Sequence, residues 1–199
     1  MTTYTLTLFA HVSGAIGYFA AMGVWLFGLT ALRRAARVEQ VRTLTDLMGR
    51  LGPLFGLSVL LILASGLFMA FTTWGFQTGW IDVALVSLVL IAPAGGLLIE
   101  PRRRFISRLA QDAPDGPVPQ ALAQQTRDPV LLTTVWTVTA LLLGIVFLMT
   151  NKPSLIAALL VMAVALALGL ASGALVMRRA RDTAHDVAPE MNQPNIPMR

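Results

Sequence analysis

Five apolar runs, each of about twenty residues or more, restrict this chain to a membrane environment. They cover residues 4–32, 51–73, 80–99, 130–150 and 154–177. A helix rises about 1.5 Å per residue, so each run can cross about 30 Å of hydrocarbon. Only 13% of the residues are charged and the mean hydropathy is +0.71, whereas soluble domains carry roughly a quarter charged residues. We predict an all-α fold, a polytopic membrane bundle of five transmembrane helices forming one domain over residues 1–180.

The basic residues predict the orientation of this bundle. Fourteen of the fifteen lie in three segments on one predicted side, and Lys152 lies on the other. The fourteen are Arg33, Arg34, Arg37, Arg42, Arg50, Arg102, Arg103, Arg104, Arg108, Arg127, Arg178, Arg179, Arg181 and Arg199. By the positive-inside rule the N-terminus is outside and the C-terminus is cytoplasmic. Binding of anionic lipid is a second use compatible with these arginines, whereas nucleic-acid binding is disfavoured.

The segments between the runs have their own predicted forms. "ARVEQVRTLTDLMGR" places Val38, Val41, Leu44 and Met48 on one helical stripe, which predicts an interfacial helix. Residues 181–199 are predicted to be a disordered cytoplasmic tail. Pro93 falls inside the third run and is expected to kink that helix.

Small residues recur at helical spacing in three of the runs. They are Ser13, Gly17, Ala21 and Gly28, then Gly52 and Gly56, then Ala165, Gly169 and Gly173. Small side chains let membrane helices approach closely. Packing within this one bundle is the favoured reading, and contact with a second copy or with other membrane subunits is the alternative.

His11 is the one ionisable residue placed well inside a run. It lies about seven residues into the first run, roughly 10 Å below the outer surface, and such residues are functional candidates by default. Depth alone selects Met69 and Met162 as outer-leaflet neighbours. Met22 follows three helical turns further in, on the same face of the first helix as His11.

An imidazole with one or two thioethers suits a His/Met haem iron or a soft Cu(I) site. His11 would be the metal ligand, with Met69, Met162 and Met22 as candidate partners. The other histidine, His185, falls in the predicted tail, so a bis-histidine haem within one chain is excluded, while a dimer could supply two copies of His11. In the alternative reading, His11 hydrogen-bonds inside the bundle and the methionines fill gaps.

The first run, "LFAHVSGAIGYFAAMGVWLFGLTALRRA", resembles the first helix of the copper-resistance-D-like and HemJ-like membrane superfamily. It looks closest to a bacterial integral-membrane family of unknown function in that neighbourhood. The resemblance covers the first run; the rest matches in span pattern and length. It implies haem b or metal at His11 and a multi-pass location in the bacterial inner membrane. HemJ-like protoporphyrinogen oxidases also use a lysine in a later helix, and Lys152, in an outer turn, does not match it.

Several function classes lack support in the sequence. The chain has no cysteine, which excludes disulfides and thiolate metal sites, and it shows no hydrolytic triad, phosphate loop or HExxH motif. Hydrolytic and nucleotide chemistry therefore have no support in the sequence, and whether the protein is an enzyme stays open. The leading hypothesis is haem b binding for electron transfer or within a membrane redox complex. The alternatives are a cofactor-free accessory or assembly subunit and a copper-handling protein.

Overall fold

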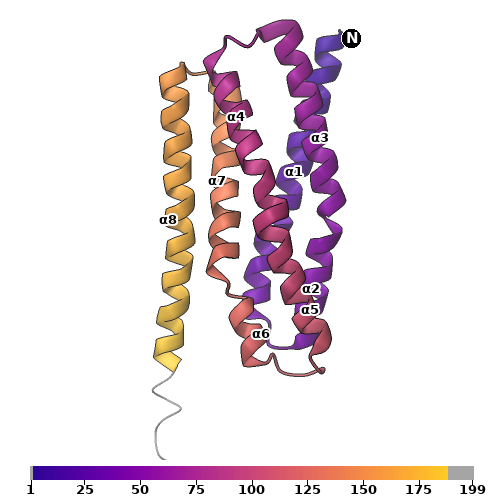
Figure 1. Cartoon of the computed structure of the whole chain (residues 1–199), viewed down its shortest axis with the longest axis vertical. Helices are drawn as coiled ribbons and strands as arrows, with labels where there is room; N and C mark the ends of the chain where they lie inside the picture. The colour runs from indigo at the N-terminus through magenta and orange to yellow at the C-terminus, as the bar shows by residue number, and fades with distance from the viewer. Residues whose placement is uncertain (1, 188–199) are drawn as a thin grey trace, which may run out of the picture.

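The computed structural model describes residues 2–187, with side chains through residue 175, and in this range the chain is a bundle of long helices (Figure 1). Five helical segments are long and apolar enough to cross a membrane, which confirms the predicted all-α membrane bundle. The elements are α1 Thr3–Arg34, α2 Val38–Arg50, α3 Gly52–Met69, η1 Ala70–Trp74, α4 Gly79–Ala94, η2 Gly95–Ile99, α5 Glu100–Asp112, α6 Gln120–Gln125, α7 Pro129–Asn151 and α8 Leu155–Val187. Here η marks a single π-helical turn.

The two ends of the bundle differ in charge. An odd number of crossings puts the N-terminus at one end and the end of α8 at the other (Figure 1). The helix ends and short helices at the end away from the N-terminus carry the arginines of residues 33–50 and 102–127. We name this end the arginine end. Helix α8 continues to Val187 and therefore includes His185 and the start of the predicted tail; residues 188–199 lie outside the described part of the chain.

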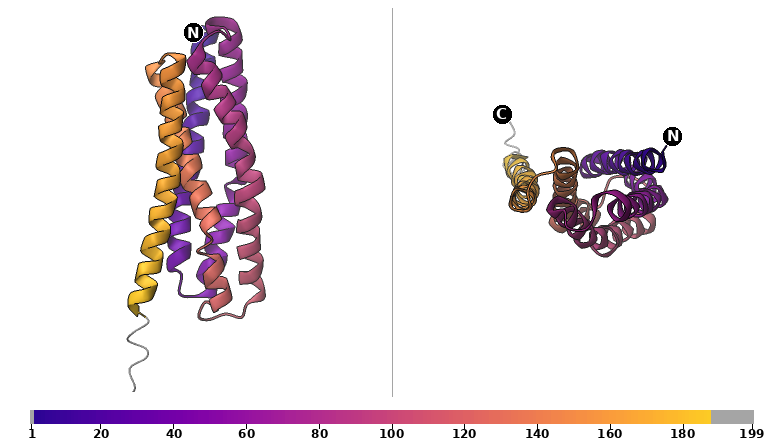
Figure 2. Two further views of the ribbon diagram at one scale, coloured as in Figure 1. Left: turned by 60° about the vertical axis from the view of Figure 1, so that its left-hand side comes forward. Right: turned by 90° about the horizontal axis from the view of Figure 1, so that it is seen from above.

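Two antiparallel helix pairs build the membrane part, and α4 lies between them. Helix α1 packs along α3, α7 packs along α8, and α4 contacts α7 more than it contacts α8. Viewed from above, α8 stands at one edge of the molecule with α7 beside it, and α1 lies on the other side of α7 (Figure 2). The outer edge formed by α8 is thus the part most distant from α1.

Glycines set the spacing inside both pairs. A Cβ atom added at Gly14 or Gly17 of α1 would lie 3.0 or 2.8 Å from atoms of α3. One added at Gly169 or Gly173 of α8 would lie 2.6 or 2.8 Å from a Cα atom of α7. These stripes of small residues therefore pack within the chain, as the favoured reading predicts. Gly52 and Gly56 behave differently, because among the described residues no atom outside their own stretch of helix lies within 4 Å of their added Cβ atoms.

Buried side chains form two clusters at different levels of the bundle. Met22, Trp25 and Leu29 of α1 belong to the larger cluster, towards the arginine end, with Val41 of α2 and Leu132 of α7. The smaller cluster lies near the other end and joins η1, α4, α7 and α8. Its members are Ala70, Trp80, Ile81, Val83, Ala84, Leu148, Ala158 and Met162. The half of α1 nearest the N-terminus contributes to neither cluster and packs mainly on α3.

Helix α2 forms where the stripe predicts a helix, but it does not lie along the membrane surface. Its backbone continues through Leu51 into α3 with only a helical cap between them. Val38, Val41 and Met48 are buried at 2% exposure or less, because the stripe packs against α5 and α1. Burial by protein takes the place of burial in lipid for these side chains.

Two interruptions of the helices have local causes. Pro93 lies in the last turn of α4, and the π-helical turn η2 begins two residues later. Proline removes a backbone donor and crowds the preceding turn, so a local change of helix type at this position is expected. The π-helical turn η1 ends at Gly75, whose φ of 74° suits glycine.

Glycine contacts between α7 and α8 give the first prediction. Gly169→Ala should lower the melting temperature by several degrees, because the new methyl group meets the Thr137 backbone at 2.6 Å and overpacking costs about 1–3 kcal/mol. Gly56→Ala is the matched control, since its site is open and alanine favours a helix by about 1 kcal/mol. Thermal unfolding in detergent measures both. Equal melting temperatures for the two variants would contradict the close α7–α8 contact.

Candidate functional site

His11 lies at the contact between α1 and α3 and is hydrogen-bonded across it. Its Nδ1 atom is 3.0 Å from the backbone carbonyl oxygen of Ile62 and 3.2 Å from Oγ of Ser65. The Ser65 hydroxyl itself donates to the carbonyl of Leu61. The side chain of Ser65 is buried, whereas His11 is half-buried.

These partners decide which ring nitrogen of His11 carries the proton. A carbonyl oxygen can only accept a hydrogen bond, so Nδ1 must donate to Ile62. In the neutral imidazole Nε2 is then unprotonated and has a free lone pair. Nε2 has no hydrogen-bond partner among the described residues. It is also not one of the polar atoms in this range that are both fully buried and unpaired. The lone pair therefore reaches the surface of the molecule.

Gly66 makes room for the ring of His11. A Cβ atom at Gly66 would lie 3.0 Å from Cε1 and 3.3 Å from Nδ1 of the imidazole, so the ring rests against the α3 backbone. Gly14, one turn along α1, meets Leu61 and the Ser58 carbonyl at 3.0 Å in the same way. The two helices are too close at this level to hold a planar cofactor between them.

Met69 lies on the same face of α3 as the residues that hold His11. It follows Ile62 by seven residues and Ser65 by four, and like Ser65 it is buried. Gly14 pairs with Leu61 and Gly17 with Ser58, and this antiparallel register places Met69 about one turn beyond His11, towards the N-terminal end. Of the three candidate methionines, Met69 is the one near the imidazole.

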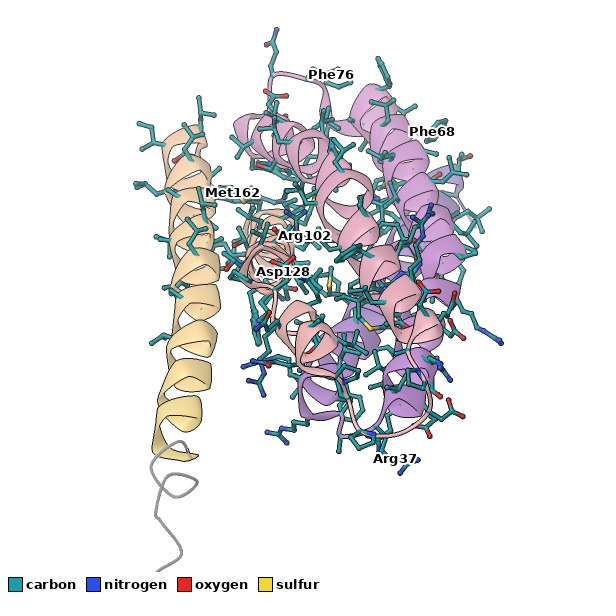
Figure 3. The ribbon with its side chains drawn as sticks, turned by 60° about the horizontal axis from the view of Figure 1, so that its bottom comes forward. Arg37, Phe68, Phe76, Arg102, Asp128 and Met162 are labelled. Atoms are coloured by element: carbon teal, nitrogen blue, oxygen red, sulfur yellow. The ribbon has the colours of Figure 1, made fainter. Side chains whose placement is uncertain are left out.

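The other two methionines lie away from the imidazole, Met22 at the expected distance along α1 and Met162 beside another helix. Met22 is eleven residues from His11 on the same helix, about 16 Å along its axis, and packs in the larger cluster with Trp25. The sulfur of Met162 would lie 3.1 Å from a Cβ atom at Gly144, so it packs between α8 and α7 (Figure 3). Depth in the sequence pattern gives a residue's height along the membrane normal, but it does not say which helices are neighbours in the bundle. Here α7 lies between α8, which carries Met162, and α1 (Figure 2).

The donor set at His11 fits one axial position of a haem or one ligand of a soft metal ion. Metal-binding histidines usually donate their second ring N–H to a carbonyl or carboxylate, which fixes the tautomer, and Ile62 provides such a carbonyl here. No group of three histidine, cysteine or acidic side chains gathers anywhere in the described residues. A metal at Nε2 would lie outside the α1–α3 contact and would need further donors from elsewhere.

A second polar constellation, at the arginine end, was not predicted from the sequence. Arg103 of α5 donates to both carboxylate oxygens of Glu100, at 2.9 and 2.6 Å, and to the backbone carbonyl of Thr45 in α2, at 2.9 Å. Trp25 of α1 donates its ring N–H to the carbonyl of Met48, at 3.2 Å. Two backbone carbonyls near the end of α2 thus accept hydrogen bonds, one from α5 and one from α1.

Two more arginines tie distant segments together at the same end. Arg42 of α2 donates to the carbonyls of Ala110 and Ala113 and pairs with Asp115 at 2.5 Å. Arg102 pairs with Asp128, the N-cap of α7, at 3.0 Å (Figure 3). The spacing of Glu100 and Arg103 could have signalled a local pair, but the long-range carbonyl partners have no local sequence signal.

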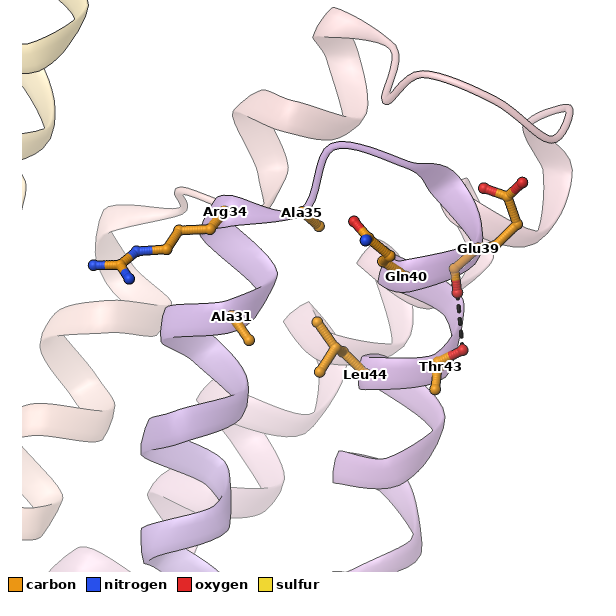
Figure 4. Close-up of a pocket in the computed structure, with 7 residues that line it drawn as sticks. All are labelled: Ala31, Arg34, Ala35, Glu39, Gln40, Thr43 and Leu44. Carbon is orange, nitrogen blue, oxygen red and sulfur yellow. Dashed lines mark hydrogen bonds between the residues drawn. The ribbon is translucent and has the colours of Figure 1, made fainter.

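A cavity of about 550 Å³ opens between the end of α1 and the start of α2. It is lined by Ala31, Arg34, Ala35, Glu39, Gln40, Thr43 and Leu44 (Figure 4). Three of these side chains are apolar, and the carboxylate of Glu39 is paired with Arg37. The guanidinium group of Arg34 extends away from Leu44 and Gln40 (Figure 4). The lining offers no group of metal ligands or nucleophiles.

No family model, curated protein or solved structure matches this chain. Function is therefore inferred from the residues themselves, above all from the imidazole held at the α1–α3 contact.

The buried environment of Arg103 gives the second prediction. Arg103→Gln should destabilise the fold by about 1–3 kcal/mol, because it breaks the pair with Glu100 and leaves the Thr45 carbonyl without this donor. Arg104→Gln is the control: this side chain also pairs with Glu100 but is 64% exposed, against 12% for Arg103, so its loss should cost less than about 1 kcal/mol. Thermal unfolding compares the two. If Arg104→Gln lost more thermal stability than Arg103→Gln, the prediction would be contradicted, because the more exposed ion pair would then contribute more to stability.

Proposed function

We propose that this integral membrane protein binds haem b through Nε2 of His11, on the surface of the α1–α3 pair. One observation supports the proposal most directly: the Ile62 carbonyl holds Nδ1 as a donor, at 3.0 Å. An imidazole held in this way presents its Nε2 lone pair in a defined direction, as iron-binding histidines do. The resemblance of the first helix to the haem-associated superfamily points to the same residue.

The surroundings of His11 suit an apolar cofactor. Leu8, Val12 and Ala15 are its neighbours along α1, and Leu8 and Val12 are exposed on the surface of the chain. Apolar contacts of this kind would hold the porphyrin ring and keep water from the iron, which tunes its potential. When bound, haem b supplies one-electron transfer. The protein would then serve as an electron carrier or as a subunit of a membrane redox complex.

A further ligand for the haem iron would have to come from a donor outside the α1–α3 contact. Met69 lies about one turn away along α3, on the side where the two helices meet. Met22 and Met162 face other parts of the bundle. A second copy of His11 or a residue of another subunit would complete the site, since the half of α1 nearest the N-terminus packs mainly on α3.

The charges support an orientation for this proposal, and the resemblance of the first helix supports a location. The positive-inside rule makes the arginine end cytoplasmic, which places the N-terminus and His11 towards the outer side. We assign the protein to the inner membrane of a bacterium as a multi-pass protein. A haem at His11 would then exchange electrons near the outer surface of that membrane.

A specific observation favours a second candidate, a cofactor-free accessory or assembly subunit. The hydrogen bond from His11 to Ile62 connects α1 to α3 without any ligand. Such a bond between membrane helices contributes about 0.6 kcal/mol or more to the stability of the helix pair, so His11 could have a purely structural role. Copper handling is the remaining alternative, in which Cu(I) would bind Nε2 with thioether donors.

The third prediction separates these functions through His11→Asn. An asparagine side chain retains an N–H donor for the Ile62 carbonyl but has no imidazole nitrogen to bind iron. Haem binding predicts a Soret band in the purified wild-type protein that disappears in His11→Asn while the melting temperature changes little. His185→Asn is the matched control and should keep the band. Absorption spectra and thermal unfolding provide the measurements.

Metal analysis of the same samples distinguishes the alternatives. Iron lost in His11→Asn supports haem, whereas copper lost in its place supports the copper-handling alternative and contradicts haem binding. A wild-type protein with neither metal and no Soret band, even after haem is supplied during expression, would overturn the proposal in favour of the accessory subunit.

A further inference from the structure

Five arginines at the arginine end have no ion pair among the described side chains, and three of them act on one another electrostatically, whereas Arg50 and Arg108 do not act on Arg33. Arg33 and Arg34 close α1, and Arg127 directly precedes the N-cap of α7. Among the side chains of residues 2–175, no carboxylate lies within ion-pair distance of these three, whereas Arg37, Arg42, Arg102, Arg103 and Arg104 are all paired. We name Arg33, Arg34 and Arg127 the arginine triad.

The charges of the triad act on one another. Arg34 and Arg127 are the groups whose positive charges oppose that of Arg33. Arg33 is half-buried, whereas Arg34 and Arg127 are exposed. Like charges close to a half-buried charged group destabilise the fold unless an anion compensates them. The triad joins the end of the first span to the start of the fourth, so it draws together two segments that repel each other electrostatically.

Arg33 also has an unsatisfied donor. Its Nε atom is fully buried and has no hydrogen-bond partner in the described part of the chain. A buried N–H of a charged group without an acceptor is costly, and such atoms mark places where an ion or water completes the structure. The Arg34 guanidinium extends away from Leu44 and Gln40 of the nearby cavity (Figure 4), so it remains available to the triad.

We propose that the arginine triad binds the phosphate group of an anionic phospholipid. Phosphate oxygens accept charge-assisted hydrogen bonds from several guanidinium groups at once, which would satisfy Arg33 Nε and offset the repulsion. Lipid is favoured over soluble phosphate because the triad lies where a membrane-spanning helix reaches the headgroup level. Val130, three residues beyond Arg127 in the first turn of α7, is an exposed apolar side chain, against which an acyl chain could pack.

The fourth prediction tests this site by native mass spectrometry of the full chain with added phospholipid. Phosphatidylglycerol should bind the wild-type protein more tightly than phosphatidylcholine. Arg33→Gln should weaken binding of phosphatidylglycerol by roughly fivefold, since one arginine near an anionic surface contributes about 1 kcal/mol. Arg108→Gln is the matched control: this arginine is exposed at the same end and has no ion pair among the described side chains.

A second arm distinguishes the source of the phosphate. Inorganic phosphate at millimolar concentration should not displace the bound phosphatidylglycerol. Displacement, or equal binding of the two phospholipids, would overturn the lipid site. If Arg108→Gln and Arg33→Gln weakened the binding of phosphatidylglycerol equally, the site would also be overturned. The lipid would then be attracted by the total positive charge of the arginine end and not by the triad. The melting temperature of each variant is measured alongside, and Arg127→Gln replaces Arg33→Gln if the latter does not fold.

Discussion

The close approach of antiparallel helices at glycine is the contact on which the rest of the structure depends. Water is excluded from the bilayer core, so the helices gain little from hiding apolar side chains and must instead pack closely. Gly14, Gly17 and Gly66 bring α1 against α3, and Gly169 and Gly173 bring α8 against α7. The imidazole of His11 reaches the carbonyl of Ile62 only because Gly66 leaves space for its ring.

The two ends of the bundle are held by different forces. Towards the N-terminal end, α1 has α3 as its main partner, and α4, α7 and α8 form their own apolar cluster. At the arginine end, guanidinium groups donate to backbone carbonyls of distant segments, as Arg42 does to Ala110 and Arg103 to Thr45. The polar end thus connects the helix pairs, and the half of α1 that carries His11 stays accessible from the membrane.

Sequence reasoning predicted the five spans and the separation of charge, because both follow from one-dimensional patterns. It also predicted that α2 is a helix, although the stripe of Val38 and Val41 is buried by protein rather than by lipid. The structure places Met162 against α7 and not beside His11, since hydropathy gives depth in the membrane but not the order of helices around the bundle. The bonds of Arg42 and Arg103 could not be predicted, because they join residues 58 to 73 positions apart.

The tautomer of His11 is the most direct test of the account. The chain has two histidines, so ¹⁵N-histidine labelling of a His185→Asn variant isolates the His11 imidazole in a solid-state NMR spectrum of the protein in lipid. The account predicts a protonated Nδ1 bonded to the Ile62 carbonyl and an unprotonated Nε2, whose signal shifts when haem is added. A protonated Nε2 with a bare Nδ1 would contradict the geometry at the α1–α3 contact, and with it the proposed ligand.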